Sequence, residues 1–173
     1  MVTPRPHSRL SLFVASALFG GTALPETLHA QPGPTIAELV EVADIEALSP
    51  SPDGRLLAFR VQRASIAANS HVIEWRVADL ETGQTRRIAD GGGPINTDGL
   101  LEIEPAIWSP DGRFIHHRSL IEGAIGIWRT AADGSGSSLL VGGDADVESL
   151  APVAGGRELT YVTGPSREEV SRA

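Results

Sequence analysis

The residues that could do chemistry in this 173-residue chain are carboxylates, histidines and serines, because it contains no cysteine and no lysine. Without cysteine there is no disulfide, thiolate metal site or thiol nucleophile. Without lysine there is no phosphate-loop lysine, Schiff base or Ser-Lys dyad. A net charge of -8 argues against a nucleic-acid partner, which would require a basic face. What remains is acid–base work, a carboxylate-bound cation or an activated serine.

Three short clusters have the residue types for acid–base or metal chemistry: Glu102 and Glu104; His116 and His117; and Asp144, Asp146 and Glu148. Alternate residues of a strand share a face, so the two acidic clusters could each present their carboxylates together. Adjacent histidines point to opposite faces and cannot share a metal ion. We interpret the two glutamates as surface residues and the histidines as a satisfied or exposed pair. The aspartates and Glu148 are interpreted as a solvated turn and strand start, since no calcium-type loop follows them. We therefore assign no catalytic, cofactor-binding or metal residue and expect no cofactor.

An activated serine would need a Gly-x-Ser-x-Gly turn between a strand and a helix, and the sequence contains none. The nearest stretch, Gly-Ser-Gly-Ser-Ser at 134–138, is expected to be a hairpin turn. The glycines at 91–93 lack the lysine and the helix of a phosphate loop, so we expect a flexible connection. The arginines at 86–87 are too few to indicate an anionic partner.

A repeat organises the elements that must position these residues. Ser-Pro-Asp-Gly-Arg occurs at 51–55 and again at 109–113, and a degenerate copy lies at 152–157. Pro and Asp favour the early positions of a tight turn and Gly its left-handed position, so each copy predicts a hairpin. A strand with a tryptophan and then a glycine turn follows at 74–83 and 126–136. Four short strands recurring every 40–60 residues or so are typical of β-propeller blades.

We therefore predict an all-β fold, a partial β-propeller of two to three four-stranded antiparallel blades over 45–173. The blades are expected at about 45–89, 104–141 and, incomplete, 146–173. Strands are expected at 45–49, 55–61, 72–79, 84–89, 104–109, 113–118, 125–131, 137–141, 146–152 and 157–162. Trp75, Trp108 and Trp128 are expected to pack between blades. The alternative is an open meander or a sandwich.

Residues 1–30 predict a secretory signal peptide. Positive residues at positions 5–9 precede an apolar stretch at 10–24, and Ala30 offers a cleavage site. The alternative is a membrane anchor, but the apolar run is shorter than the roughly 20 residues that a bilayer crossing needs. The mature chain would be periplasmic or secreted, which suits its lack of cysteine.

A short helical lead-in is expected at 31–44. Thr35 and Glu38 have the spacing of a capping box. One apolar stripe is formed by Ile36, Leu39, Val40 and Ile45.

Two to three blades are too few to close a ring, since propellers use about four to eight. We therefore expect the chain to be the amino-terminal piece of a longer protein. The alternative is a small protein that closes the ring by oligomerising. An open blade face and unpaired strand edges would promote aggregation.

The hairpin repeats resemble the propeller repeats of TolB-like proteins and of the prolyl oligopeptidase family, peptidase S9. Longer stretches are similar to the amino-terminal part of the lasso peptide isopeptidases, namely 41–45, 48–55, 58–60, 64–66, 143–150 and 164–169. The resemblance covers 35–173. It implies a hydrolase that opens the isopeptide bond of a lasso peptide's ring with a Ser-Asp-His triad on a carboxy-terminal α/β-hydrolase domain. In that family the propeller gates and helps to hold the peptide.

The chain departs from the family pattern because it lacks the nucleophile turn, so no catalytic residue can be carried over. We predict the propeller segment of a secreted serine hydrolase that gates and binds a lasso peptide and is inactive alone. No nucleic-acid partner and no membrane span after signal cleavage are expected. The alternatives are a non-catalytic TolB-like periplasmic binding module and the propeller of another peptidase of the same broad family.

Overall fold

The computed structural model describes residues 33–97, 99–153 and 157–172. From residue 34 onward these residues belong to one compact unit, Pro34–Ala173. The predicted signal peptide lies outside the described residues. Within them, neither helix has the length and hydrophobicity that a bilayer crossing requires.

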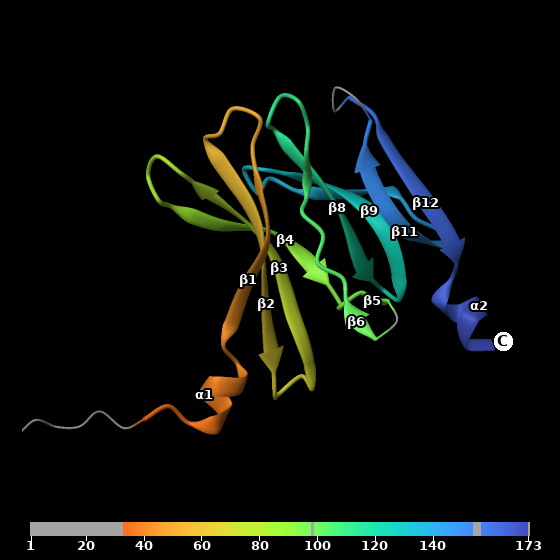
Figure 1. Cartoon of the computed structure of the whole chain (residues 1–173), viewed down its shortest axis with the longest axis horizontal. Coiled ribbons are helices and arrows are strands. Elements are labelled where there is room, and N and C mark those ends of the chain that lie inside the picture. The colour runs from red at the N-terminus through yellow and green to blue at the C-terminus, as the bar shows by residue number, and fades with distance from the viewer. Residues whose placement is uncertain (1–32, 98, 154–156, 173) are drawn as a thin grey trace, which may run out of the picture. The chain divides into compact units, whose positions relative to one another are not determined.

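The first blade is a four-stranded antiparallel meander (Figure 1). Its strands are β1 (Ala43–Pro50), β2 (Leu56–Ser65), β3 (Ser70–Asp79) and β4 (Thr85–Gly92). Each strand pairs with its successor, and β2 pairs with β3 along its whole length. The strands are expected from the sequence at nearly these positions, because turn residues separate them.

The second blade repeats this arrangement. Its strands are β7 (Ile107–Trp108), β8 (Phe114–Ile121), β9 (Ala124–Ala131) and β10 (Ser137–Val141). Strand β7 is much shorter than the predicted 104–109, and the acidic residues before it leave the strand. A small hairpin of β5 (Asn96–Thr97) and β6 (Leu100–Leu101) lies between the two blades in sequence.

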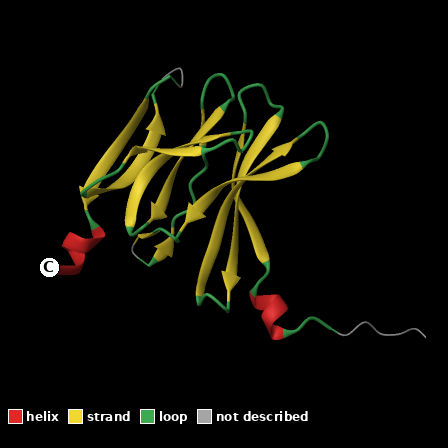
Figure 2. Cartoon of the chain, turned by 180° about the vertical axis from the view of Figure 1, so that it is seen from behind, coloured by secondary structure: helices red, strands yellow, loops and turns green. Residues whose placement is uncertain are grey.

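The third sheet contains two antiparallel strands, β11 (Ala145–Pro152) and β12 (Leu159–Pro165). Helix α1 (Ile36–Val40) precedes the first blade and helix α2 (Arg167–Arg172) follows β12. Both helices and the β5–β6 hairpin lie toward the same end of the strands (Figures 1 and 2). Two complete blades and the first half of a third make this an all-β partial propeller, as predicted.

The Ser-Pro-Asp-Gly-Arg turns form by local hydrogen bonding. The Ser51 hydroxyl donates to the Asp53 carboxylate at 2.7 Å, and the same carboxylate accepts from the Arg55 amide at 3.1 Å. Gly54 takes a φ of 71°, which favours glycine. The second copy at 109–113 repeats these contacts. The hairpins thus follow from turn chemistry alone.

Glycine is also required where the blades meet, so the expectation of a flexible connection at 91–93 is wrong. Gly92 ends β4 in a parallel bridge to Leu120 of β8, and the Gly93 amide donates to the Leu120 carbonyl at 2.8 Å. Gly92 has a φ of 74°, and a Cβ placed there would lie 2.3 Å from the Leu120 oxygen. Only glycine allows this close approach of the two backbones.

Helix α1 has the predicted capping box. The Thr35 hydroxyl accepts from the Glu38 amide, and the Glu38 carboxylate accepts from the Thr35 amide at 2.7 Å. The predicted apolar stripe does not pack on the blades, because α1 has no buried residue and Ile45 on β1 is also exposed.

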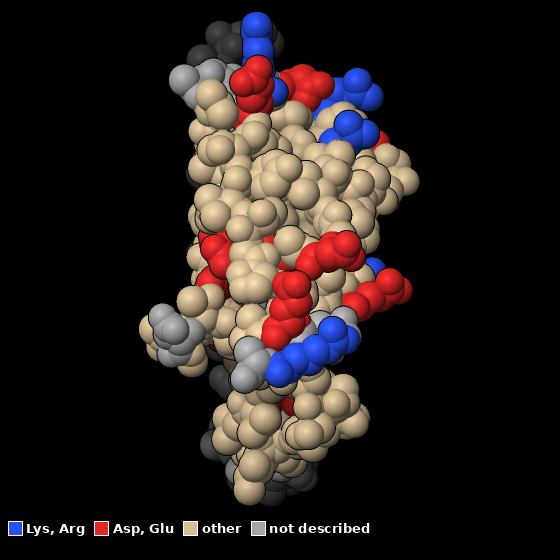
Figure 3. Space-filling view, turned by 90° about the vertical axis from the view of Figure 1, so that its right-hand side faces the viewer, with Lys and Arg blue, Asp and Glu red and all other residues tan. Residues whose placement is uncertain are grey.

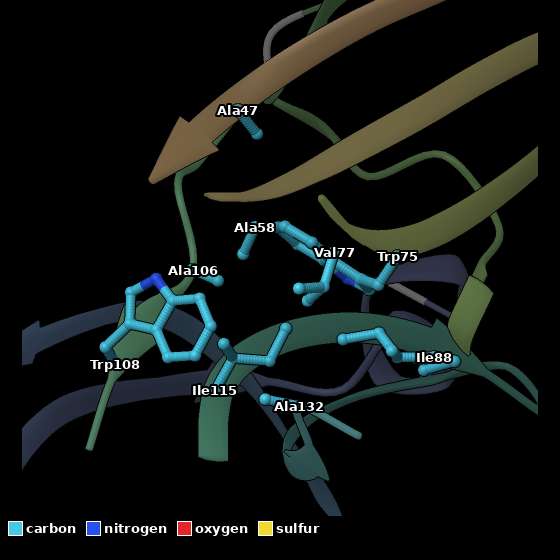
Figure 4. Packing of buried hydrophobic residues seen from close by; sticks show 10 residues of the cluster. Ala47, Ala58, Trp75, Val77, Ile88, Ala106, Trp108, Ile115 and Ala132 are labelled. Carbon is cyan, nitrogen blue, oxygen red and sulfur yellow. The ribbon is translucent and has the colours of Figure 1, made fainter. Parts of the chain in front are cut away.

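The main core lies between the first two blades (Figure 4). It joins Ala58, Trp75 and Val77 of the first blade to Trp108 and Ile115 of the second. The Trp108 indole Nε1 also donates to the Ser49 carbonyl at 2.9 Å, which ties the second blade to β1. Trp75 and Trp108 are therefore core residues, as predicted.

Trp128 differs from the other two tryptophans, and its expected position between blades is wrong. Trp75 pairs with Arg60, but the equivalent arginine of the second blade, Arg118, pairs with Ile127, and Trp128 pairs with His117. A shift of one residue turns a side chain to the other face of a sheet. Trp128 is only half-buried and lines a cavity of about 300 Å³.

Candidate functional site

In each complete blade, an arginine on the second strand holds a glutamate that lies on the first strand or shortly before it. Arg60 Nε donates to Glu46 at 2.7 Å, and Arg118 Nε donates to Glu104 at 2.7 Å. Both pairs are separated by 14 residues, so they occupy matching positions of the repeat. The two ion pairs are thus one structural element used twice.

Each of these arginines also reaches the chain of the following blade. Arg60 Nη2 donates to the Glu102 carbonyl at 3.1 Å. Arg118 Nη1 donates to the Val147 carbonyl at 3.0 Å and to the Glu148 carbonyl. The guanidinium groups therefore join successive blades, and we call Arg60 and Arg118 the inter-blade arginines.

Arg118 is the most fully bonded of the charged groups. Its side chain is 4% exposed, and it pairs with Glu102 as well as with Glu104. Burial opposes the charged form, but the hydrogen bonds to Glu104 and Glu102 outweigh it and raise the pKa of Arg118. A buried charge needs such compensation, because an unpaired one is strongly destabilising.

Glu102 is more buried than the surface residue that we expected, whereas Glu104 lies partly at the surface, and both are held by Arg118. Their side chains are 25% exposed for Glu102 and 44% for Glu104. Glu102 also accepts from the Thr97 hydroxyl. Arg118 draws both carboxylates together, so they serve as partners of a cation and not as an acid–base pair.

A groove of about 760 Å³ opens beside this network. Its walls come from the β5–β6 hairpin, from β11 and from the end of the chain around α2. Polar groups of Asn96, Thr97 and Glu148 share the lining with apolar side chains of Ile125 and Val170. On the side of the molecule where β12 and α2 lie, acidic side chains form a band (Figure 3). The groove is thus lined by both apolar and acidic side chains.

Of the acidic triplet at the start of β11, which we expected to be solvated, only Asp146 departs from that expectation. Asp146 is buried and accepts from the Ile125 amide at 2.8 Å, while Asp144 and Glu148 are exposed. A register shift between Val147 and Ser149 breaks the alternation of the strand. Within the described residues, no three His, Asp or Glu side chains lie close enough to hold a metal ion.

The adjacent histidines lie on opposite faces, as predicted. His117 is buried, and its ring nitrogens pair with the Ser119 hydroxyl at 3.0 Å and the Thr130 hydroxyl at 2.9 Å. Burial lowers the pKa of His117 to about 3. His116 pairs with the Ile107 carbonyl at 3.2 Å. His117 is thus a neutral core residue and not a proton-transfer group.

The stretch at 134–138 covers the end of the turn between β9 and β10, where we expected a hairpin turn, and the first two residues of β10. The Gly134 amide donates to the Ala131 carbonyl at 3.0 Å, which closes the turn. Among the residues that the structure describes, no histidine contacts Ser135 or Ser137: the Ser135 amide bonds Asp133, and the Ser137 hydroxyl bonds Thr130.

Comparison with known proteins gives a likeness to a lasso peptide isopeptidase. No family model matches the chain. The chain is similar to lasso peptide isopeptidase AtxE2 of Asticcacaulis excentricus, with 27% identity over 135 residues, 65% of this chain and 19% of AtxE2. It thus spans about a fifth of the length of that relative.

Solved structures agree with this likeness. An AtxE2 variant with Astexin3-dC4 bound matches with a TM-score of 0.65 and 25% identity, over 69% of this chain and 22% of that chain. TolB from Acinetobacter baumannii matches with a TM-score of 0.52 and 24% identity, over 70% of this chain and 27% of that chain. The TolB likeness shows the fold alone. The resemblance to lasso peptide isopeptidases and TolB-like propellers is therefore confirmed.

Proposed function

We propose that this chain is the amino-terminal propeller segment of a secreted, prolyl-oligopeptidase-like serine hydrolase that resembles the lasso peptide isopeptidases. The observation that supports it most strongly is the match to AtxE2, which extends over about two thirds of the chain in both sequence and structure. In this proposal residues 1–30 are a signal peptide, 31–44 a lead-in and 45–173 propeller blades.

The segment's work in this proposal is to admit and hold the peptide. The groove of about 760 Å³ offers polar and apolar walls to an extended chain. The inter-blade arginine Arg118 fixes the second blade against the third, so the walls of the groove keep their spacing. That an AtxE2 variant holds Astexin3-dC4 supports a lasso peptide as the ligand.

The reacting serine in this proposal belongs to a part of the protein outside these 173 residues. The sequence has no Gly-x-Ser-x-Gly turn, and the buried His117 is already bonded on both ring nitrogens. The segment contributes binding and access, and the triad contributes the bond cleavage.

The test starts from the whole open reading frame that contains these 173 codons. We expect it to encode a Gly-x-Ser-x-Gly turn followed by the acidic and histidine members of a triad. The protein expressed from that frame is incubated with a lasso peptide, and mass spectrometry follows the gain of one water at the isopeptide bond. Replacement of the serine in the turn by alanine is the matched control.

The outcomes separate the candidate functions. Cleavage that disappears in the alanine variant supports the proposal. A frame that encodes further blades and then stops, with no such turn, contradicts it and indicates a TolB-like binding module. A folded, full-length hydrolase that cleaves linear peptides but leaves the lasso ring intact also contradicts it and indicates another peptidase of the broad family.

A further inference from the structure

A second cavity, of about 230 Å³, opens where the first two blades meet at their turns. The first blade contributes Leu56 and Arg86 to its walls. The second contributes Arg113 and Phe114 from the start of β8, and Asp133 from the turn after β9. Both blades are complete, so this pocket does not depend on any further blade.

Arg86, on the first blade, is held in place by a hydrogen bond to the second blade. Its Nε donates to the Ala132 carbonyl of the second blade at 3.1 Å. This bond uses one of the five guanidinium donors and leaves the terminal nitrogens for a ligand. The side chain is therefore oriented before any ligand arrives.

Arg113 is oriented by an aromatic ring. Its guanidinium carbon lies 5.7 Å from the centre of the Phe114 ring, and that of Arg129 lies 4.5 Å from the same centre. A guanidinium beside a ring keeps its N–H edge available, and that edge matches a carboxylate with two parallel hydrogen bonds. The guanidinium groups of Arg113 and Arg129 thus both lie near the ring of Phe114, which lines the pocket.

The repeat shows that Arg113 lacks the partner of its counterpart. Arg55, at the same position of the first blade, pairs with Glu81 at 3.6 Å. In the second blade the shorter Asp133 accepts from the Ser135 amide instead, at 2.9 Å. Within the described part of the chain, Arg113 makes no ion pair.

The charges around the pocket favour an anion. Arg86 and Arg113 line the pocket together with one carboxylate, that of Asp133, whose pKa is lowered by its hydrogen bonds with Ser135 and also by the charge of Arg86. The charge of Arg113 also acts on Asp111, two residues before it in the chain. The lining thus carries two cationic groups and one carboxylate, on a chain whose net charge is -8. Leu56 and Phe114 make the rest of the lining apolar.

We propose that this pocket binds a carboxylate that carries an apolar group, in the form of the C-terminal residue of a peptide. Arg86 from the first blade and Arg113 from the second hold the carboxylate, and the apolar side chain of the peptide's last residue packs on Leu56 and Phe114. The proposal does not depend on the hydrolase function. The two arginines at 86–87 alone did not indicate an anionic partner in the sequence, because the second cation of this pocket, Arg113, comes from the next repeat.

The test measures binding to the full chain by calorimetry and by NMR shifts. The probes are acetyl-Gly-Gly-Leu with a free C-terminus, its C-terminal amide, and 4-methylpentanoate. We expect the free acid to bind about tenfold more tightly than the amide, because only the acid forms charge-assisted hydrogen bonds. Raising the salt concentration should weaken the binding of the free acid.

Variants assign the effect to the pocket. Arg86→Gln and Arg113→Gln should each weaken the binding of the free acid about tenfold. Arg63 is an exposed arginine on β2, and Arg63→Gln should leave this binding unchanged. Circular dichroism confirms that each variant is folded.

The outcomes decide between ligands. Tighter binding of the peptide acid than of 4-methylpentanoate supports a peptide C-terminus. Equal binding of the two overturns the peptide and indicates a free carboxylic acid. Equal binding of acid and amide, no binding at millimolar probe, or an equal loss in Arg63→Gln overturns the site.

Discussion

Replacing Arg118 by methionine should show how much the inter-blade arginines stabilise the chain. Methionine keeps the length of the side chain and its apolar stem but removes the charge and every donor. The change leaves Glu102, Glu104 and the carbonyls of Val147 and Glu148 without their shared partner. Of these groups, the two carboxylates cost the most free energy.

The expected loss follows from burial. Removing one partner of a buried ion pair costs about 3–5 kcal/mol, because the other charge stays buried without compensation. The Arg118 side chain is 4% exposed, but that of Glu104 is 44% exposed and can regain water. We therefore expect the lower end of the range, about 3 kcal/mol of the free energy of unfolding.

Two matched variants calibrate this value. Arg60→Met breaks the equivalent pair with Glu46, whose side chains are 8% and 13% exposed, and should cost about 3–4 kcal/mol. Arg55→Met breaks a pair with Glu81 whose side chains are 71% and 78% exposed, and should cost less than about 1 kcal/mol.

Urea unfolding of the full chain, followed by tryptophan fluorescence, measures these losses. A double-mutant cycle with Glu104→Gln then isolates the coupling between Arg118 and that carboxylate. If Arg118→Met lost no more stability than Arg55→Met, the interpretation that the inter-blade arginines join successive blades would be refuted.

Three further predictions concern single residues. Burial lowers the pKa of His117 from 6.5 in the unfolded chain to about 3, so the unfolded state takes up this proton first and the His117 contribution is lost as pH falls from 6.5 toward 3. The slope is about 1.4 kcal/mol per pH unit, and urea titrations at several pH values should show a shallower dependence in His117→Gln; an unchanged slope would contradict the buried neutral ring. Trp128 is half-buried, whereas Trp75 and Trp108 are buried, so Trp128→Phe should remove most of the acrylamide-quenchable fluorescence; equal quenching of Trp75 or Trp108 would contradict their burial. Gly54→Ala should lower the free energy of unfolding by about 1 kcal/mol through backbone strain, since no atom lies near the added Cβ, and Gly54→Asn should cost less.

The hairpins could be predicted from the sequence because their causes are local. The turn at 51–55 is closed by the hydrogen bonds of Ser51 and Asp53, all within a few residues. The capping box of Thr35 and Glu38 is equally local. Such features need no knowledge of which strands become neighbours.

The errors arose where a side chain's surroundings depend on a distant segment. Glu102 and Glu104 precede a strand and looked solvated, but Arg118 on the next strand draws them inward. The matching spacing of Glu46 and Arg60 was a usable signal, because it repeats in the second blade. Trp128 was misplaced because a shift of one residue reverses the face of a strand.

We propose that this segment holds a lasso peptide and that the bond cleavage belongs to a part of the protein outside these 173 residues. The most direct measurement incubates the full chain with a lasso peptide, then analyses both the peptide retained by the chain and its mass. We predict that the peptide is retained with its ring intact. Release of the ring-opened peptide by this chain alone would contradict the account, and so would a failure of the folded chain to retain it.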